Sequence, residues 1–180
     1  MNMNIRPSGF RSAILLFLVG WMAVSGVTPD AGTTSDAMQR MTPFIGKWKT
    51  VSLYPDRGLR VPGELEYRWV LGKNWVLVIF VGQHPERVYW EAIAMIRFDP
   101  VKNCYISHDF FNDGDPIKMT GSWITPRTIR FELEDEKGLS GIDYTVKADG
   151  TIFQENWIIR KDKKKKVTLK TTYTRSNVQP

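Results

Sequence analysis

The feature that most constrains this chain is a succession of strand-like segments from Phe44 to Arg175 with no helical pattern between them. Short apolar and aromatic runs are separated by clusters of Gly, Pro, Asn and Asp, which supply or fix the backbone angles of turns. Because each connection is only a few residues long, consecutive strands are expected to pair as hairpins. We therefore predict an all-β fold, a single antiparallel up-and-down β-barrel of about ten strands with a short N-terminal helical turn.

The strands are expected at Phe44–Leu53, Val61–Leu71, Trp75–Gly82, Arg87–Phe98, Cys104–Phe111, Ile117–Trp123, Thr128–Glu134, Ser140–Lys147, Ile152–Lys161 and Val167–Arg175.

The N-terminal residues have the order of a secretory signal. Arg6 and Arg11 precede an apolar run, Ala13–Ala23, and small residues follow at 24–26. We predict a signal peptide over residues 1–26 and export to the periplasm or the extracellular space. The apolar run is shorter than the roughly 20 residues of a membrane span. An uncleaved anchor is the alternative, and membrane association is expected only in that case.

The remainder divides into a short tether and one domain. Residues 27–40 are polar and lack periodicity, so we predict a flexible tether that ends in a helical turn around Ser35 to Met41. Residues 41–176 form the predicted barrel, a size that supports one core. The single Cys104 excludes an internal disulfide, and we expect it to act as a small buried hydrophobe.

Alternation along the strands assigns the predicted faces of the barrel. Side chains of a strand point alternately to opposite sides, so the apolar members of each alternating run should face the interior. The predicted inward set includes Leu65, Ile129, Phe131, Leu133, Ile142, Val146, Phe153, Ile159, Val167 and Leu169. It also includes residues with aromatic or polar ends, and these are Tyr67, Trp69, Tyr144, Glu155, Trp157, Thr171 and Tyr173.

Those seven aromatic or polar residues are the candidate ligand-binding residues. A barrel filled only for stability favours aliphatic side chains, whereas polar groups in a lumen can orient a ligand. The alternative is a filled barrel in which the same groups form internal hydrogen bonds.

Two of the predicted strands are apolar on both faces. The segments 75–82 and 87–98 lack clean alternation, which indicates that their outer side is covered. Either the N-terminal helical turn or a second copy of the chain is the predicted cover, and the latter implies a homodimer.

The net charge of +6 is concentrated in one basic run at residues 160–166. The simplest interpretation is a solvated hairpin tip, and contact with an anionic lipid or glycan is the alternative. No aromatic residue lies within the run, so we predict no nucleic-acid partner.

Catalytic and metal-binding patterns are weak. Ser107, His108 and Asp109 are consecutive on one predicted strand, so His108 should face away from the other two and no triad is expected. Two His and one Cys are too few for a typical zinc site. We predict no catalytic residue, no metal and no cofactor. Glu155 and His108 are the residues on which an enzyme, for instance a hydrolase or isomerase, would depend.

Several short motifs occur in a familiar order. They are Gly46-Lys47-Trp48, the segment from Gly63-Glu64 to Leu71-Gly72, Phe98-Asp99-Pro100 and Thr172-Tyr173-Thr174-Arg175. This series resembles the DUF1579 family of bacterial lipocalin-like barrels over about Met41 to Arg175. The resemblance implies a closed antiparallel barrel of calycin type and assigns no chemistry. The neighbouring nitrobindin-like barrels bind haem through a histidine on the final strand, and this chain has none there.

We thus expect an exported lipocalin-like barrel that binds a small, largely apolar ligand without catalysis. The alternatives are a filled, dimerising envelope module and an enzyme that uses Glu155.

Overall fold

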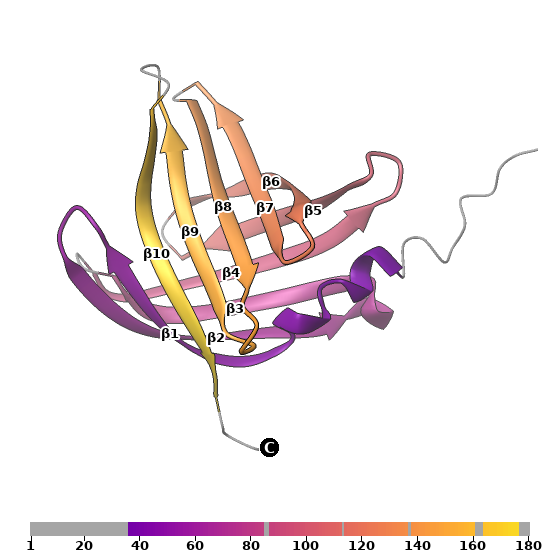
Figure 1. Ribbon diagram of the computed structural model, residues 1–180, viewed down its shortest axis with the longest axis horizontal. Helices are drawn as coiled ribbons and strands as arrows, with labels where there is room; N and C mark the ends of the chain where they lie inside the picture. The colour runs from indigo at the N-terminus through magenta and orange to yellow at the C-terminus, as the bar shows by residue number, and fades with distance from the viewer. Residues whose placement is uncertain (1–35, 85–86, 113, 137, 161–163, 177–180) are drawn as a thin grey trace, which may run out of the picture.

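Ten antiparallel strands form one closed barrel, as the sequence predicts (Figure 1). The computed structural model describes residues 36–176 except 85–86, 113, 137 and 161–163. The strands are β1 (Gly46–Tyr54), β2 (Leu59–Val70), β3 (Trp75–His84), β4 (Arg87–Asp99), β5 (Cys104–Phe111), β6 (Gly114–Thr125), β7 (Thr128–Asp135), β8 (Gly138–Val146), β9 (Ile152–Ile159) and β10 (Lys165–Arg175). Each strand pairs with its neighbours in sequence, and the pairing of β1 with β10 closes the barrel.

The turns between the strands follow the local chemistry of the sequence. Gly58, between β1 and β2, and Gly150, between β8 and β9, have φ angles of 62° and 82°, a region that glycine enters without steric cost. Asp99 Oδ1 accepts hydrogen bonds from the backbone N–H groups of Val101 and Lys102 and so stabilises the β4–β5 turn. The turn chemistry expected from Gly and Asp is therefore present at these three connections.

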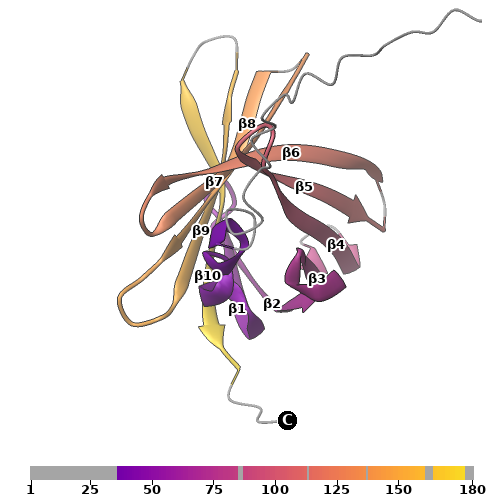
Figure 2. The ribbon, with the colours of Figure 1, turned by 90° about the vertical axis from the view of Figure 1, so that its right-hand side faces the viewer.

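A short helical segment closes one end of the barrel. A single helical turn over residues 36–39 precedes the 3-10 helix η1 (Thr42–Phe44). Met38, Met41 and Phe44 are each 1% exposed and belong to the core. The Trp48 indole N–H donates a hydrogen bond of 2.7 Å to the carbonyl of Phe44. Figure 2 shows this segment lying within the ring of strands.

The position of this segment corrects two expectations. The helical turn predicted around Ser35 to Met41 is present at residues 36–39, but its Met38 packs in the barrel, so this end of the predicted tether belongs to the core. For the same reason the helical turn does not cover the outer faces of β3 and β4. The predicted signal peptide and the rest of the predicted tether lie outside the described residues. Within the described part of the chain, no helix has the length and apolar character to cross a membrane.

Five of the nine strand connections lie at the end of the barrel opposite the helical segment. The connections β1–β2, β3–β4, β5–β6, β7–β8 and β9–β10 all lie there, because consecutive antiparallel strands alternate in direction. The helical segment lies at the end that carries the β2–β3, β4–β5, β6–β7 and β8–β9 connections. We call these the open end and the closed end.

The closed end generates the first prediction. Met41→Ala should lower the free energy of unfolding by about 2–5 kcal/mol, because it leaves a cavity in a packed core. Val101→Ala is the matched control, since Val101 is 93% exposed and should change stability by less than about 0.5 kcal/mol. Urea unfolding followed by tryptophan fluorescence measures both. Equal stabilities of the two variants would show that the segment is not part of the core.

Candidate functional site

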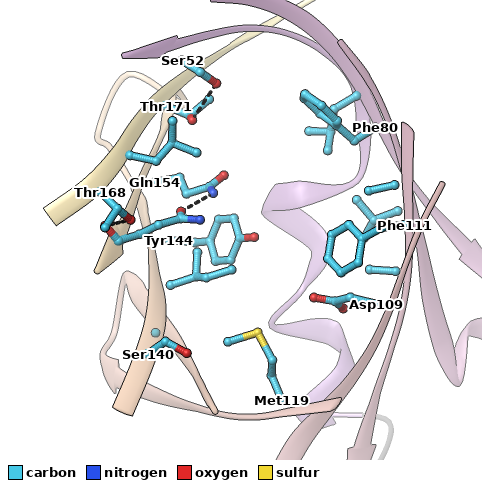
Figure 3. Close-up of a pocket in the computed structure, with 18 of the residues that line it drawn as sticks. Ser52, Phe80, Asp109, Phe111, Met119, Ser140, Tyr144, Gln154, Thr168 and Thr171 are labelled. Atoms are coloured by element: carbon cyan, nitrogen blue, oxygen red, sulfur yellow. Dashed lines mark hydrogen bonds between the residues drawn. The ribbon is translucent and has the colours of Figure 1, made fainter. Parts of the chain in front are cut away.

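The barrel encloses a cavity of about 350 Å³ toward the open end (Figure 3). Its lining comes from β1 to β6 and from β8 to β10, so the cavity is the lumen itself. Small side chains on β4 leave much of this space open. Ala92 pairs with Phe111 and Ala94 pairs with Asp109 on β5. Larger aliphatic side chains in place of the two alanines would occupy part of the volume.

One wall of the lumen is largely apolar. Val78, Phe80, Ala92 and Phe111 from β3, β4 and β5 line it, and Figure 3 shows Phe80 and Phe111 on the same side of the cavity. Ile117 and Met119 from β6 continue this wall. Such a surface suits an apolar molecule, because burial of apolar area contributes roughly 25 cal/mol per Å².

The facing wall carries a ladder of polar groups from β1, β9 and β10. Ser52 and Thr171 share a hydrogen bond of 2.9 Å, and both side chains are buried. The Tyr173 hydroxyl donates to Gln154 Oε1, and Gln154 Nε2 donates to Asn156 Oδ1 at 2.5 Å. These bonds hold the side chains in fixed orientations along the lumen, which is the arrangement that a ligand site requires.

Among the described residues that line the lumen, Asp109 is the only carboxylate, and none is a Lys, Arg or His. It projects from β5 on the side opposite Tyr144 (Figure 3). The Ser107 hydroxyl donates a hydrogen bond to Asp109 Oδ1. Burial raises the pKa of Asp109, and the Ser107 hydrogen bond and His108 only partly offset this effect.

Three tyrosines surround the inner part of the lumen. Burial raises the pKa values of Tyr67, Tyr144 and Tyr173 well above their ordinary range. A neighbouring tyrosine and the negative charge of Asp109 raise the pKa values of Tyr67 and Tyr144 further. All three phenols are therefore neutral near neutral pH and can donate and accept hydrogen bonds.

Five of the seven predicted site residues border this lumen. They are Tyr67, Tyr144, Trp157, Thr171 and Tyr173, and Trp157 reaches it from an outward-facing position. Trp69 also belongs to the inward side of β2, but it packs against the core and does not line the cavity.

The predicted orientation of β9 is wrong. Gln154 and Asn156 line the lumen, whereas Glu155 lies on the outer face and pairs with Lys165 at 3.2 Å. Glu155 is therefore not a polar anchor in the cavity, and the enzyme alternative loses its proposed lumen carboxylate.

Trp157 shares the outward orientation, although it borders the cavity. Its ring is flanked by the guanidinium of Arg130 and the ammonium of Lys165, at 5.1 and 5.0 Å from the ring centroid. A Cβ atom at Gly141 would overlap the Trp157 ring, so the absence of a side chain there allows the indole to lie flat on β8. The indole is buried without facing the interior, which the alternation pattern alone does not reveal.

A β-bulge changes the last strand. The register of β10 against β9 shifts between Val167 and Leu169, and Thr168 and Leu169 both line the lumen. Val167 pairs with the outward Trp157 and therefore faces outward, contrary to the predicted alternation. A bulge adds one residue to a strand, so it reverses the faces of the residues before it.

Sequence reasoning missed Asp109, Gln154, Asn156 and Ser52 as lumen residues. Asp109 follows Tyr105 and Ser107 at every second position of β5, so its side chain faces the same side as theirs. Because Tyr105 and Ser107 are buried, this alternation indicates that Asp109 faces the interior. The prediction that His108 faces away from Ser107 and Asp109 agrees with the strand geometry, because the hydrogen-bonded pair Ser107 and Asp109 shares the inner face. In the described residues, no group of three His, Cys, Asp or Glu side chains is placed to hold a metal ion.

Comparison with one solved structure supports the fold. The chain is similar to the crystal structure of Rv2717c from M. tuberculosis, with a TM-score of 0.57 and 15% identity over 78% of this chain and 98% of that chain. A de novo designed fluorescence-activating β-barrel gives a TM-score of 0.41 and 16% identity over 78% and 98% of the two chains. No family model matches the chain. No curated protein matches it in sequence. The class of protein is thus a closed antiparallel up-and-down β-barrel.

Asp109 generates a prediction about pH. Its raised pKa means that the native state binds the proton more tightly than the unfolded chain, so this residue lowers stability as pH rises above 3.8, the ordinary value. Asp109→Asn should therefore stabilise the protein at about pH 7, and the gain should shrink at about pH 4.5.

Urea unfolding at the two pH values tests this prediction. Asp115→Asn, at an exposed position on β6, is the control and should change stability by less than about 0.5 kcal/mol at both values. A loss of stability in Asp109→Asn at neutral pH would contradict the proposed cost of this carboxylate.

Proposed function

We propose that this chain is an exported barrel that binds a small, largely apolar molecule in its lumen. The observation that carries the proposal is the cavity of about 350 Å³ with an apolar wall facing a hydrogen-bonded polar wall. Its volume is within the range of small-molecule sites. The filled-barrel alternative is disfavoured, because Tyr67, Tyr144, Thr171 and Tyr173 border open space rather than close it.

Filling the lumen tests the proposal directly. Ala94 lines the cavity, and Ala94→Phe should place a ring in that space. We expect the apolar fluorescent probe N-phenyl-1-naphthylamine to bind the unmodified protein saturably. Ala94→Phe should weaken this binding at least about tenfold, which corresponds to about 1.4 kcal/mol.

Val51→Phe is the matched control for this experiment. Val51 is 46% exposed on β1, so its replacement adds the same ring outside the barrel. Its affinity for the probe should equal that of the unmodified protein. If both variants bind the probe as the unmodified protein does, the lumen is not the binding site.

Export and family membership are further parts of the proposal. The basic, apolar and small-residue order of residues 1–26 supports a cleaved signal, and a mature protein that retains Met1 would contradict it. The order of short motifs and the closed barrel they form support a relationship to the DUF1579 family. A sequence profile built from homologues of this chain that fails to reach that family would contradict the relationship.

We also propose a homodimer through the outer faces of segments 75–82 and 87–98. Val81 on β3, Ile93 on β4 and Phe110 on β5 are 37%, 39% and 46% exposed, and Ile93 pairs directly with Phe110. These residues form an apolar surface that the N-terminal helical segment leaves uncovered. Sedimentation that shows only monomer at high protein concentration would contradict the dimer.

A further inference from the structure

Asp109 distinguishes this lumen from a purely apolar pocket. A carboxylate taken out of water is costly unless a cation or several hydrogen bonds compensate it. Ser107 donates one hydrogen bond to Asp109, and the described lining of the cavity contains no basic side chain. Among the residues that the structure describes, the carboxylate thus keeps acceptor capacity that is open toward the lumen.

Two described cations near the open end are engaged elsewhere. Lys165 pairs with Glu155 and Asp143, and Lys166 pairs with Asp56 at 2.7 Å. These pairs lie outside the lumen, on the outer face or at the β1–β2 turn. They do not bring a positive charge to Asp109.

The pairing register places further acceptors and aromatic surface around Asp109. Tyr67, Val78, Ala94 and Asp109 are successive partners across β2, β3, β4 and β5, so they form one inward row. Phe111 lies two residues beyond Asp109 on the same face, and Tyr144 faces it from β8 (Figure 3). The two small members of the row, Val78 and Ala94, leave room for a ligand group beside the carboxylate.

From this geometry we propose that the lumen ligand carries a protonated amine, which pairs with Asp109 while the rest of the molecule lies on the apolar wall. An ammonium group has several N–H donors. One would bond to the Asp109 carboxylate, and others would reach the hydroxyl oxygens of Tyr67 and Tyr144. Nearby aromatic rings further favour a cation. This inference rests on the proposed function and specifies the chemical class of the ligand.

A matched pair of probes isolates the charge. 1-Naphthylmethylamine is protonated near neutral pH, whereas 1-naphthylmethanol has nearly the same shape and remains neutral. Calorimetry with the full chain should show that the amine binds about tenfold or more tightly than the alcohol, as expected for a hydrogen bond between charged groups in a partly desolvated site. In Asp109→Asn the two affinities should become similar.

Two further variants complete the experiment. Asp149→Asn removes an exposed carboxylate from the β8–β9 turn at the closed end, and it should keep the preference for the amine. Ala94→Phe should lose both ligands. Asp109→Asn is expected to fold, because it removes a buried charge and retains a polar partner for Ser107.

The outcomes separate the two proposals. Equal affinity of the amine and the alcohol for the unmodified protein, with loss of both in Ala94→Phe, would overturn the amine proposal and leave the lumen site intact. A preference for the amine that persists in Asp109→Asn would also overturn it. Absence of saturable binding of both probes, or binding that is unaffected by Ala94→Phe, would overturn the proposed function together with the ligand class.

Discussion

The pairing of β1 with β10 is the constraint on which the rest of the structure depends. It aligns Trp48 with Arg175 and Leu53 with Lys170, and it converts an open ten-stranded sheet into a barrel without free edges. Once the sheet is closed, alternation sends every second side chain into one shared interior. The helical segment then fills the closed end with Met38, Met41 and Phe44, and the space left over lies toward the open end. The cavity is therefore a consequence of closure combined with the small residues of β4.

Much of the barrel could be predicted from the sequence because turns and alternation are local properties. Gly58 and Gly150 mark turns by their backbone freedom and Asp99 by its side-chain acceptor. The strands β2, β7 and β8 each show a single apolar face. The faces of β9 and the start of β10 could not be predicted in the same way. Trp157 packs outward because Gly141 on the neighbouring strand leaves room for it, and the bulge near Val167 depends on the pairing of two distant segments. The burial of Met38 likewise depends on the packing of the helical segment against one end of the barrel, which is not a local property of the sequence.

The outer face of β8 and the lumen side of β5 illustrate how the same residue type serves different purposes. On the outer face, Asp143 accepts hydrogen bonds of 2.7 and 2.8 Å from Arg130, and Lys165 lies 3.7 Å away. Burial raises the pKa of Asp143, but the hydrogen bonds from Arg130 and the positive charges of Arg130 and Lys165 act together to hold it below its ordinary value. Asp109, inside the lumen, has no such cation within the described lining. The Asp143 carboxylate is thus paired with cations of the protein, whereas the Asp109 carboxylate can accept hydrogen bonds from a ligand.

An NMR titration of the Asp109 side-chain carboxyl, in the free protein and in the protein saturated with 1-naphthylmethylamine, tests the central claim most directly. We expect a pKa above the ordinary value of 3.8 in the free protein, because burial disfavours the charge. We expect the pKa to fall when the amine binds, because the ammonium stabilises the carboxylate. A pKa at its ordinary value that does not respond to the amine would show that the lumen is wet and that Asp109 is not its anchor.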